Sequence, residues 1–174
     1  MNSTAKKTAY CGMLTALAMI FSYVESLIPI SFGVPGIKLG LANLVVLSAL
    51  YFMSPGEVLA VSAARILLLG FLFGNGMSIL YSLAGGLLSF AVMLTLMKNR
   101  GFSEIGVSVA GGVSHNIGQI LVAALVLHSL KLFYYLPVLI LSGLVTGILI
   151  GILGGRIRKI LAKTYPSEKK ENRE

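Results

Sequence analysis

Residues Val58–Phe73 read VLAVSAARILLLGFLF, a run of apolar or small residues interrupted only by Arg65. An α-helix rises ~1.5 Å per residue, so Arg65 would lie about 11 Å from either end of the run. Arginine keeps its proton, and a guanidinium at that depth in a bilayer costs at least ~2.5–3.5 kcal/mol. The sequence therefore predicts that a carboxylate, a set of carbonyl groups, water or an anionic ligand faces Arg65.

The composition of the whole chain is that of a membrane protein with several spans. Of the 174 residues, 56% are hydrophobic and 11% are charged, and the mean hydropathy is +0.91. Ordinary soluble domains carry roughly 25% charged residues. A formal net charge of +8 would suggest a nucleic-acid partner for a soluble chain. Here the basic residues lie at predicted helix ends, so we expect the lipid bilayer, and no nucleic acid, as a partner.

The residue types argue against catalysis by this chain. It contains no aspartate, which excludes the aspartate-rich magnesium sites that hold prenyl diphosphates. It has no glycine-rich phosphate loop for nucleotide hydrolysis. Two histidines and one cysteine do not make a zinc site, and His115 and His128 are too far apart along one helix to share a haem. We therefore expect no enzymatic activity, no metal and no cofactor.

The hydrophobic runs predict an all-α membrane protein with six transmembrane helices. Residues 1–7 would form an N-terminal tail, residues 8–155 the transmembrane domain, and residues 156–174 a basic, partly disordered tail. Tight turns are expected at Ser54–Glu57 and Gly74–Gly76. The predicted spans are Thr8–Ile30, Leu39–Met53, Val58–Phe73, Ser78–Met97, Ile105–His128 and Phe133–Gly155.

The distribution of lysine and arginine predicts the orientation. With Arg65 set apart, eleven basic residues fall in the two tails and the fourth-to-fifth loop, whereas the opposite side holds only Lys38 and Lys131. The positive-inside rule then places both termini in the cytoplasm of a protein of the cell membrane. An even number of spans agrees with this orientation.

Small residues recur at helical spacing in the first and sixth spans. Thr8, Gly12 and Ala16 form one stripe, which predicts either packing within this protein or a docking face for another membrane subunit. Gly143-x-x-x-Gly147-x-x-x-Gly151 gives the sixth span a smooth face, which is typical of helix packing.

Polar side chains in the fifth span lie near the depth predicted for Arg65. His115 and Gln119 are four residues apart and share a helix face, and Asn116 is turned by about 100° from His115. We interpret Arg65, His115, Asn116 and Gln119 as the lining of a hydrated or ligand-filled cavity. Interhelical hydrogen bonds that only stabilise packing are the alternative.

A second polar set gathers toward the predicted outer surface. Glu25 is late in the first span, Lys38 ends the first loop, and Asn43 is one turn into the second span. Glu25 and Lys38 could pair at the interface, or Lys38 could face an anionic group that enters from outside. Glu25 could also neutralise Arg65, although its own helix would place it nearer the outer face by roughly 8–10 Å.

The run Pro35-Gly36-Ile37-Lys38-Leu39-Gly40-Leu41-Ala42-Asn43, followed by a mid-helix arginine and by His115-Asn116-Ile117-Gly118-Gln119, resembles a bacterial family. That family is labelled both heptaprenyl diphosphate synthase component I and Gx transporter. It is in turn similar to the substrate-binding S components of energy-coupling-factor (ECF) vitamin transporters. The resemblance implies a six-helix bundle with cytoplasmic termini, a site open to the outside, and a coupling subunit and ATPases as partners. S components often dock the coupling subunit through an Ala-x-x-x-Ala repeat in the first helix, where this chain has Thr8, Gly12 and Ala16.

Three functions remain open at this point. The first is binding and transport of a small anionic or carbonyl-rich solute, with Arg65, His115, Asn116 and Gln119 in the site and Lys38 on a gating loop. Asn43 and Glu25 complete that candidate site. The second is a membrane accessory subunit that binds a quinone or isoprenoid for a redox or isoprenoid partner. The third is a purely structural membrane subunit in which Arg65 is paired internally.

Overall fold

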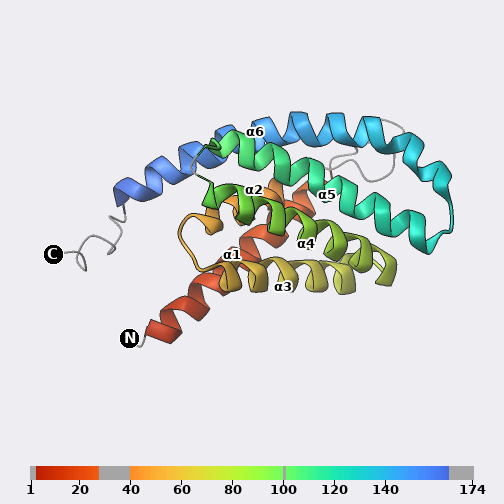
Figure 1. Cartoon of the computed structure of the whole chain (residues 1–174). Helices are drawn as coiled ribbons and strands as arrows, with labels where there is room; N and C mark the ends of the chain where they lie inside the picture. The colour runs from red at the N-terminus through yellow and green to blue at the C-terminus, as the bar shows by residue number, and fades with distance from the viewer. Residues whose placement is uncertain (1–2, 28–39, 100, 165–174) are drawn as a thin grey trace.

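The computed structural model describes residues 3–27, 40–99 and 101–164, and within these ranges the chain is helical and has no strands. The helices pack into a bundle in which α5 and α6 run side by side (Figure 1). They are α1 (Ser3–Leu27), α2 (Leu41–Leu50), α3 (Pro55–Phe73), α4 (Gly76–Lys98), α5 (Glu104–Val126), the 3-10 helix η1 (Leu130–Tyr135) and α6 (Leu136–Thr164).

Each predicted span corresponds to a helix, but the second is shorter than predicted. Within the described ranges, five helices are long and apolar enough to cross a membrane. Helix α2 has only 10 residues, so it rises ~15 Å, about half of the ~30 Å hydrocarbon core. The expectation of a second span over Leu39–Met53 is therefore corrected to a half-length helix. Helix α6 is longer than predicted and continues past Gly155 to Thr164.

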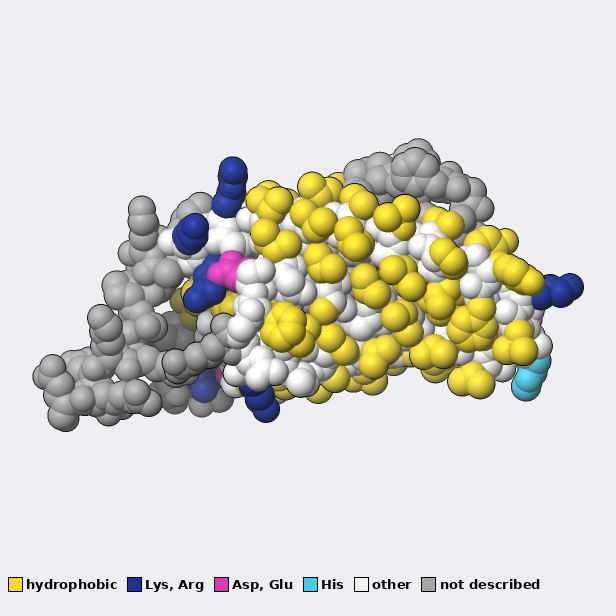
Figure 2. Space-filling model, turned by 45° about the horizontal axis from the view of Figure 1, so that its top comes forward, with side chains coloured by type: hydrophobic (Ala, Val, Ile, Leu, Met, Phe, Trp, Pro, Cys, Tyr) yellow, Lys and Arg dark blue, Asp and Glu magenta, His cyan; other side chains and the backbone are white. Residues whose placement is uncertain are grey.

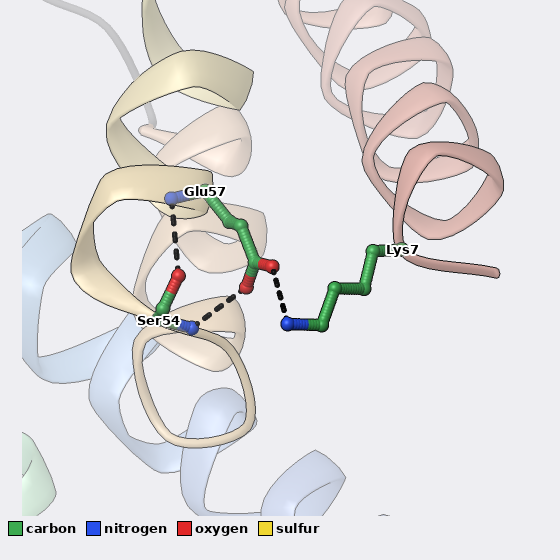
Figure 3. A network of polar contacts seen from close by, with 3 residues as sticks. All are labelled: Lys7, Ser54 and Glu57. Atoms are coloured by element: carbon green, nitrogen blue, oxygen red, sulfur yellow. Dashed lines mark hydrogen bonds and ion pairs between the residues drawn. The ribbon is translucent and has the colours of Figure 1, made fainter. Parts of the chain in front are cut away.

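Side-chain caps determine where three of the helices begin. Ser54 accepts a hydrogen bond from the Glu57 N–H, and the Glu57 carboxylate accepts one from the Ser54 N–H. This capping box starts α3 at Pro55, so the predicted turn at Ser54–Glu57 is the first turn of the helix. Glu57 also pairs with Lys7 of α1 at 3.6 Å, which joins the beginnings of the two helices (Figure 3). Asn75 and Ser103 cap α4 and α5 through their side chains as well.

Charged contacts gather at one end of the bundle. The beginning of α1 meets the beginning of α3 there through Lys7 and Glu57. At the same end of the α5–α6 pair, Arg158 of α6 forms an ion pair with Glu104 of α5 and lies over the Tyr51 ring, 4.6 Å from its centroid. Figure 2 shows basic and acidic side chains gathered at this end and a wide apolar surface beyond them. We call this the charged end.

Glycines allow α5 and α6 to approach until their backbones touch. A Cβ atom added at Gly147 would lie 2.6 Å from the Val109 Cα atom, and one at Gly151 would lie 2.6 Å from the Ile105 Cα atom. Real Cβ atoms essentially never come so close to backbone. The predicted packing role of the stripe Gly143-x-x-x-Gly147-x-x-x-Gly151 is confirmed, and α5 and α6 form the most extensively packed helix pair among the described residues.

The core lies toward the charged end and is built around α2. Seven of the ten α2 side chains are buried, and α1, α3 and α6 pack around this helix. Apolar residues lie on every face of α2, which is typical of a helix that other helices surround. The buried cluster consists of Leu44, Val46, Leu47, Ala49, Leu50, Val58, Phe90, Met93, Val107 and Ile150.

The outside of the bundle between its two ends is largely apolar. Phe71, Leu72 and Phe73 at the end of α3 are 79%, 62% and 66% exposed. Figure 2 shows hydrophobic side chains over most of the visible face between the two ends. Exposure of so large an apolar surface to water would be unfavourable, whereas contact with apolar lipid tails would not. The chain is an integral membrane protein.

The small-residue stripe of α1 faces outward. Thr8, Gly12 and Ala16 are all exposed, and a Cβ atom added at Gly12 would meet nothing within 4 Å. The expectation that this stripe packs within the protein is therefore wrong for the described residues. Helix α1 contacts α2 and α3 with its other face. Ala18, which lies on that face, is completely buried.

Candidate functional site

Arg65 of α3 points toward α1. Its Nη1 atom donates a hydrogen bond to the Ser22 hydroxyl at 3.2 Å. Glu25 lies three residues beyond Ser22, on the same face of α1, and its carboxylate interacts electrostatically with the guanidinium. The structure thus brings Arg65 and Glu25 together across the α1–α3 contact, one of the arrangements that the sequence left open.

Glu25 also joins α1 to the beginning of α2. Its Oε1 atom accepts a hydrogen bond of 2.7 Å from the Gly40 N–H, at the N-cap of α2. Gly40 has φ 75°, in the left-handed region that favours glycine. The first N–H groups of a helix lack partners within the helix and carry a partial positive charge of roughly +0.5. The Glu25 carboxylate therefore compensates two positive groups, the guanidinium and the start of α2.

The short length of α2 brings this start to the depth of Arg65. Helix α2 ends at Leu50, just before the Ser54 cap at the charged end, and its ten residues rise ~15 Å toward the interior. Arg65 is ten residues beyond Pro55, also ~15 Å from the same end. Ser22, Glu25, Gly40 and Arg65 thus form a polar group about halfway along the bundle. We call these four residues the arginine cluster.

The arginine cluster contains a buried guanidinium donor that has no partner among the described residues. The Nε atom of Arg65 is buried and has no hydrogen-bond partner within the part of the chain that the structure describes. Buried donors in native proteins are nearly always satisfied by protein, by ordered water or by a ligand. With one carboxylate opposing a guanidinium and a helix start, the cluster has an excess of positive charge. It is suited to hold an anionic or carbonyl-rich group.

His115 and Gln119 of α5 lie against α4. A Cβ atom added at Gly85 would lie 2.8 Å from the Gln119 Cγ atom and 3.1 Å from the His115 Cε1 atom. On the other side of α4, a Cβ atom at Gly86 would lie 3.1 Å from the Ile66 Cδ1 atom. Because Ile66 follows Arg65 directly, His115 and Arg65 lie at the same level of the bundle, with the glycine pair of α4 between their helices.

Asn116 points to α6 instead. Its Nδ2 atom donates hydrogen bonds to the Leu139 carbonyl at 2.7 Å and to the Ser142 hydroxyl at 3.3 Å. These are the interhelical hydrogen bonds that the sequence offered as the alternative to a cavity. Ser114 is likewise satisfied by its own helix, where its hydroxyl donates to the Ala110 carbonyl at 2.6 Å.

The remaining predicted site residues lie at the beginning of α2 or before it. Asn43 is half-buried in the first turn of α2, and its Cβ atom would lie 3.9 Å from one added at Gly40. Asn43 is thus adjacent to the arginine cluster. Lys38, predicted to lie on a gating loop, lies outside the described residues.

Sequence reasoning missed Ser22 and Gly40. A serine in an apolar helix indicates little on its own. Ser22 and Glu25, however, are spaced to share one helix face, and this spacing in the sequence could have linked Ser22 to the site. Gly40 acts through its backbone N–H, which no side-chain pattern reveals. Within the described ranges, no three His, Cys, Asp or Glu side chains lie close enough together to hold a metal ion.

An apolar exterior, helices long enough to cross a bilayer and a buried cationic cluster define the class: an all-helical integral membrane protein with a polar interior site. A family model described as "Heptaprenyl diphosphate synthase component I" matches residues 14–157. The match covers most of the chain, and the protein belongs to this family. No curated protein and no solved structure matches it.

Proposed function

We propose that the protein binds a small anionic or carbonyl-rich solute at the arginine cluster and takes part in its transport across the cell membrane. One observation carries the proposal: the Arg65 guanidinium is at mid-depth, and its buried Nε atom has no hydrogen-bond partner in the described part of the chain. A carboxylate or carbonyl oxygen of a solute would satisfy this donor. Such a pairing would offset the cost of placing the charge in the membrane.

The direction of access follows from the charge distribution. The beginning of α1 and the basic end of α6 lie at the same end of the bundle, which agrees with two termini on one side of the membrane (Figure 1). We assign that end to the cytoplasm by the positive-inside rule. The buried core around α2 then lies on the cytoplasmic side of the arginine cluster, so a solute would enter from the outer side.

His115, Gln119 and Asn43 take secondary roles in this proposal. Asn43 would contact the solute from the beginning of α2. His115 and Gln119 would act from α5 at the same level, across the close contacts that Gly85 and Gly86 of α4 allow with α5 and α3. Asn116 holds α6 and is not expected to contact the solute while its bonds to Leu139 and Ser142 persist.

The family description supports a second candidate function. A component of a prenyl diphosphate synthase that lies in the membrane would be an accessory subunit, binding an isoprenoid or a quinone for a redox or isoprenoid partner. The description of the family as a synthase component is the observation that favours this candidate.

The two candidates differ in the molecule that stabilises the purified protein. We expect small carboxylates or other carbonyl-rich water-soluble solutes to raise the melting temperature in detergent, because a ligand at 100 times its Kd adds about 2.7 kcal/mol to the stability of the folded state. The measurement is a thermal unfolding screen against water-soluble anions, neutral isosteres, quinones and prenyl diphosphates. Stabilisation by a quinone or prenyl compound alone, or its co-purification by mass spectrometry, would contradict the transport proposal and support the accessory subunit.

We further propose that the energy for transport comes from a partner that docks on the exposed stripe of α1, as the similarity to ECF S components implies. Gly12 lies in open space on this stripe, so Gly12→Leu should leave folding and solute binding unchanged. It should lower solute uptake by cells at least ~10-fold, because a side chain at a small-residue contact keeps two helix backbones apart. Uptake of labelled solute is the measurement, with Gly56→Leu, also in open space, as the matched control. Normal uptake by Gly12→Leu would contradict docking at this stripe.

A further inference from the structure

The end of the bundle opposite the charged end carries a hollow on its surface. Helix η1 connects α5 to α6 there and packs against both. The hollow has a volume of about 390 Å³ and is lined by Leu130, Lys131, Phe133 and Tyr134. The hollow is an open depression on the surface, so it suits a molecule that lies along the protein rather than one that is enclosed by it.

The side chains around this hollow combine one cation with apolar walls. Leu130 and Tyr134 are 80% and 85% exposed, and Lys131 is exposed beside them. Among the ion pairs of the described residues, none includes Lys131. The hollow follows directly on the apolar surface of α5 and α6, where Leu125 and Leu141 are 71% and 62% exposed. Its position is therefore the boundary between the hydrocarbon and the headgroups.

We propose that this hollow binds an anionic phospholipid, with the lipid phosphate at the Lys131 ammonium group and the upper part of an acyl chain against Leu130 and Phe133. The charge and the walls fit one molecule that is anionic at one end and apolar at the other. A free anion would leave the apolar walls in contact with water. A partner helix would have to bury the Lys131 charge without a carboxylate in the hollow to oppose it.

The Tyr134 side chain supports this assignment. Tyrosine is enriched at membrane interfaces because its ring is apolar and its hydroxyl is polar. At 85% exposure the ring is not held by the rest of the protein. It is placed to cover a lipid headgroup in the hollow, with its hydroxyl available to the phosphate or glycerol oxygens.

Lipid retention by the purified full-length protein tests the proposal. The protein is incorporated into nanodiscs of phosphatidylcholine with a minor fraction of phosphatidylglycerol, and the lipids that remain after transfer to detergent are counted by native mass spectrometry. We expect Lys131→Gln to lower phosphatidylglycerol retention by about fivefold, because this is the contribution of one lysine to the attraction toward an anionic membrane surface. Lys131→Arg should retain it, and Lys98→Gln, which removes an exposed lysine at the end of α4 nearer the charged end, should leave it unchanged.

Two further outcomes decide between sources of the anion. Phe133→Ser should lower retention of the lipid while Lys131 is intact, because the acyl chain would lose its wall. Glycerol 3-phosphate at millimolar concentration should not displace the lipid. Displacement by glycerol 3-phosphate, equal retention of the two lipids by the parent protein, or parental retention by Lys131→Gln would each overturn the proposal. None of these readouts depends on Arg65, so the proposed transport function and the lipid site fail separately.

Discussion

Arg65→Ala is expected to weaken solute binding by at least ~30-fold. Truncating one partner of a buried, hydrogen-bonded charge pair costs about 2–5 kcal/mol, and 1.4 kcal/mol is a factor of ten. The guanidinium is the group at mid-depth whose buried Nε atom has no partner among the described residues, so its removal should affect binding more than any other change in the site. The measurement is ligand-dependent thermal stabilisation, or isothermal titration calorimetry, with the solute that the screen identifies.

The controls for this prediction separate charge, geometry and folding. Arg65→Lys keeps the positive charge but loses the planar fork of the guanidinium, so this variant should bind with intermediate affinity. Arg156→Ala removes an exposed arginine of α6 and should bind as the parent does. If Arg65→Ala fails to fold because Glu25 is left uncompensated, the double variant Arg65→Ala with Glu25→Gln removes that charge too. A folded variant without Arg65 that binds the solute like the parent would show that the arginine is only structural.

Gly147→Leu is expected to destabilise the bundle by at least ~3 kcal/mol, at the upper end of the cost of overpacking. The first atom of any side chain at this position would lie 2.6 Å from the Val109 Cα atom and 3.0 Å from the Val109 nitrogen atom. A backbone cannot rotate away as a side chain can, so α5 and α6 would have to separate along their shared length. The better helix propensity of leucine returns only about 1 kcal/mol. Thermal and denaturant unfolding in detergent measure the loss.

Gly12→Leu is the matched control for this change. It makes the same substitution in a helix, but nothing lies within 4 Å of the new Cβ atom. We expect its stability to equal or slightly exceed that of the parent, because leucine is a better helix former than glycine. Equal unfolding midpoints for Gly147→Leu and Gly12→Leu would contradict the close α5–α6 contact.

The positions of the helices were predictable from the sequence because membrane spans are long and apolar. The turns at Ser54 and Gly74 were visible as well, since serine, proline, glycine and asparagine gather there. The length of α2 was not, because apolar residues continue past both of its ends, to Leu39 and Met53, and hydropathy alone cannot show where a helix stops. The side of the bundle that the Gly12 stripe faces could not be predicted either, because a small residue favours close packing but does not indicate which helix packs against it.

The candidate site was predictable in part, where a polar residue stands out in an apolar run. Arg65 is conspicuous in an apolar run, and a charge there requires a partner, so its electrostatic interaction with an acidic group could be anticipated. The direction of Asn116 could not, because a helix with polar residues about 100° apart can face two neighbours, and only the packing of α6 decides. The cluster also depends on the Gly40 N–H, and backbone groups are the same in every residue except proline.

The half-length of α2 has a consequence for how a solute would leave the protein. Beside Arg65, a solute would still be separated from the charged end by ~15 Å of close-packed leucine, valine and phenylalanine side chains. This apolar plug makes capture and release two distinct steps, because the plug must be displaced before the solute can pass. Helix α2 is the central part of the plug and begins at the residue that Glu25 holds, so a movement that breaks the Glu25–Gly40 hydrogen bond would loosen the binding site and the barrier together.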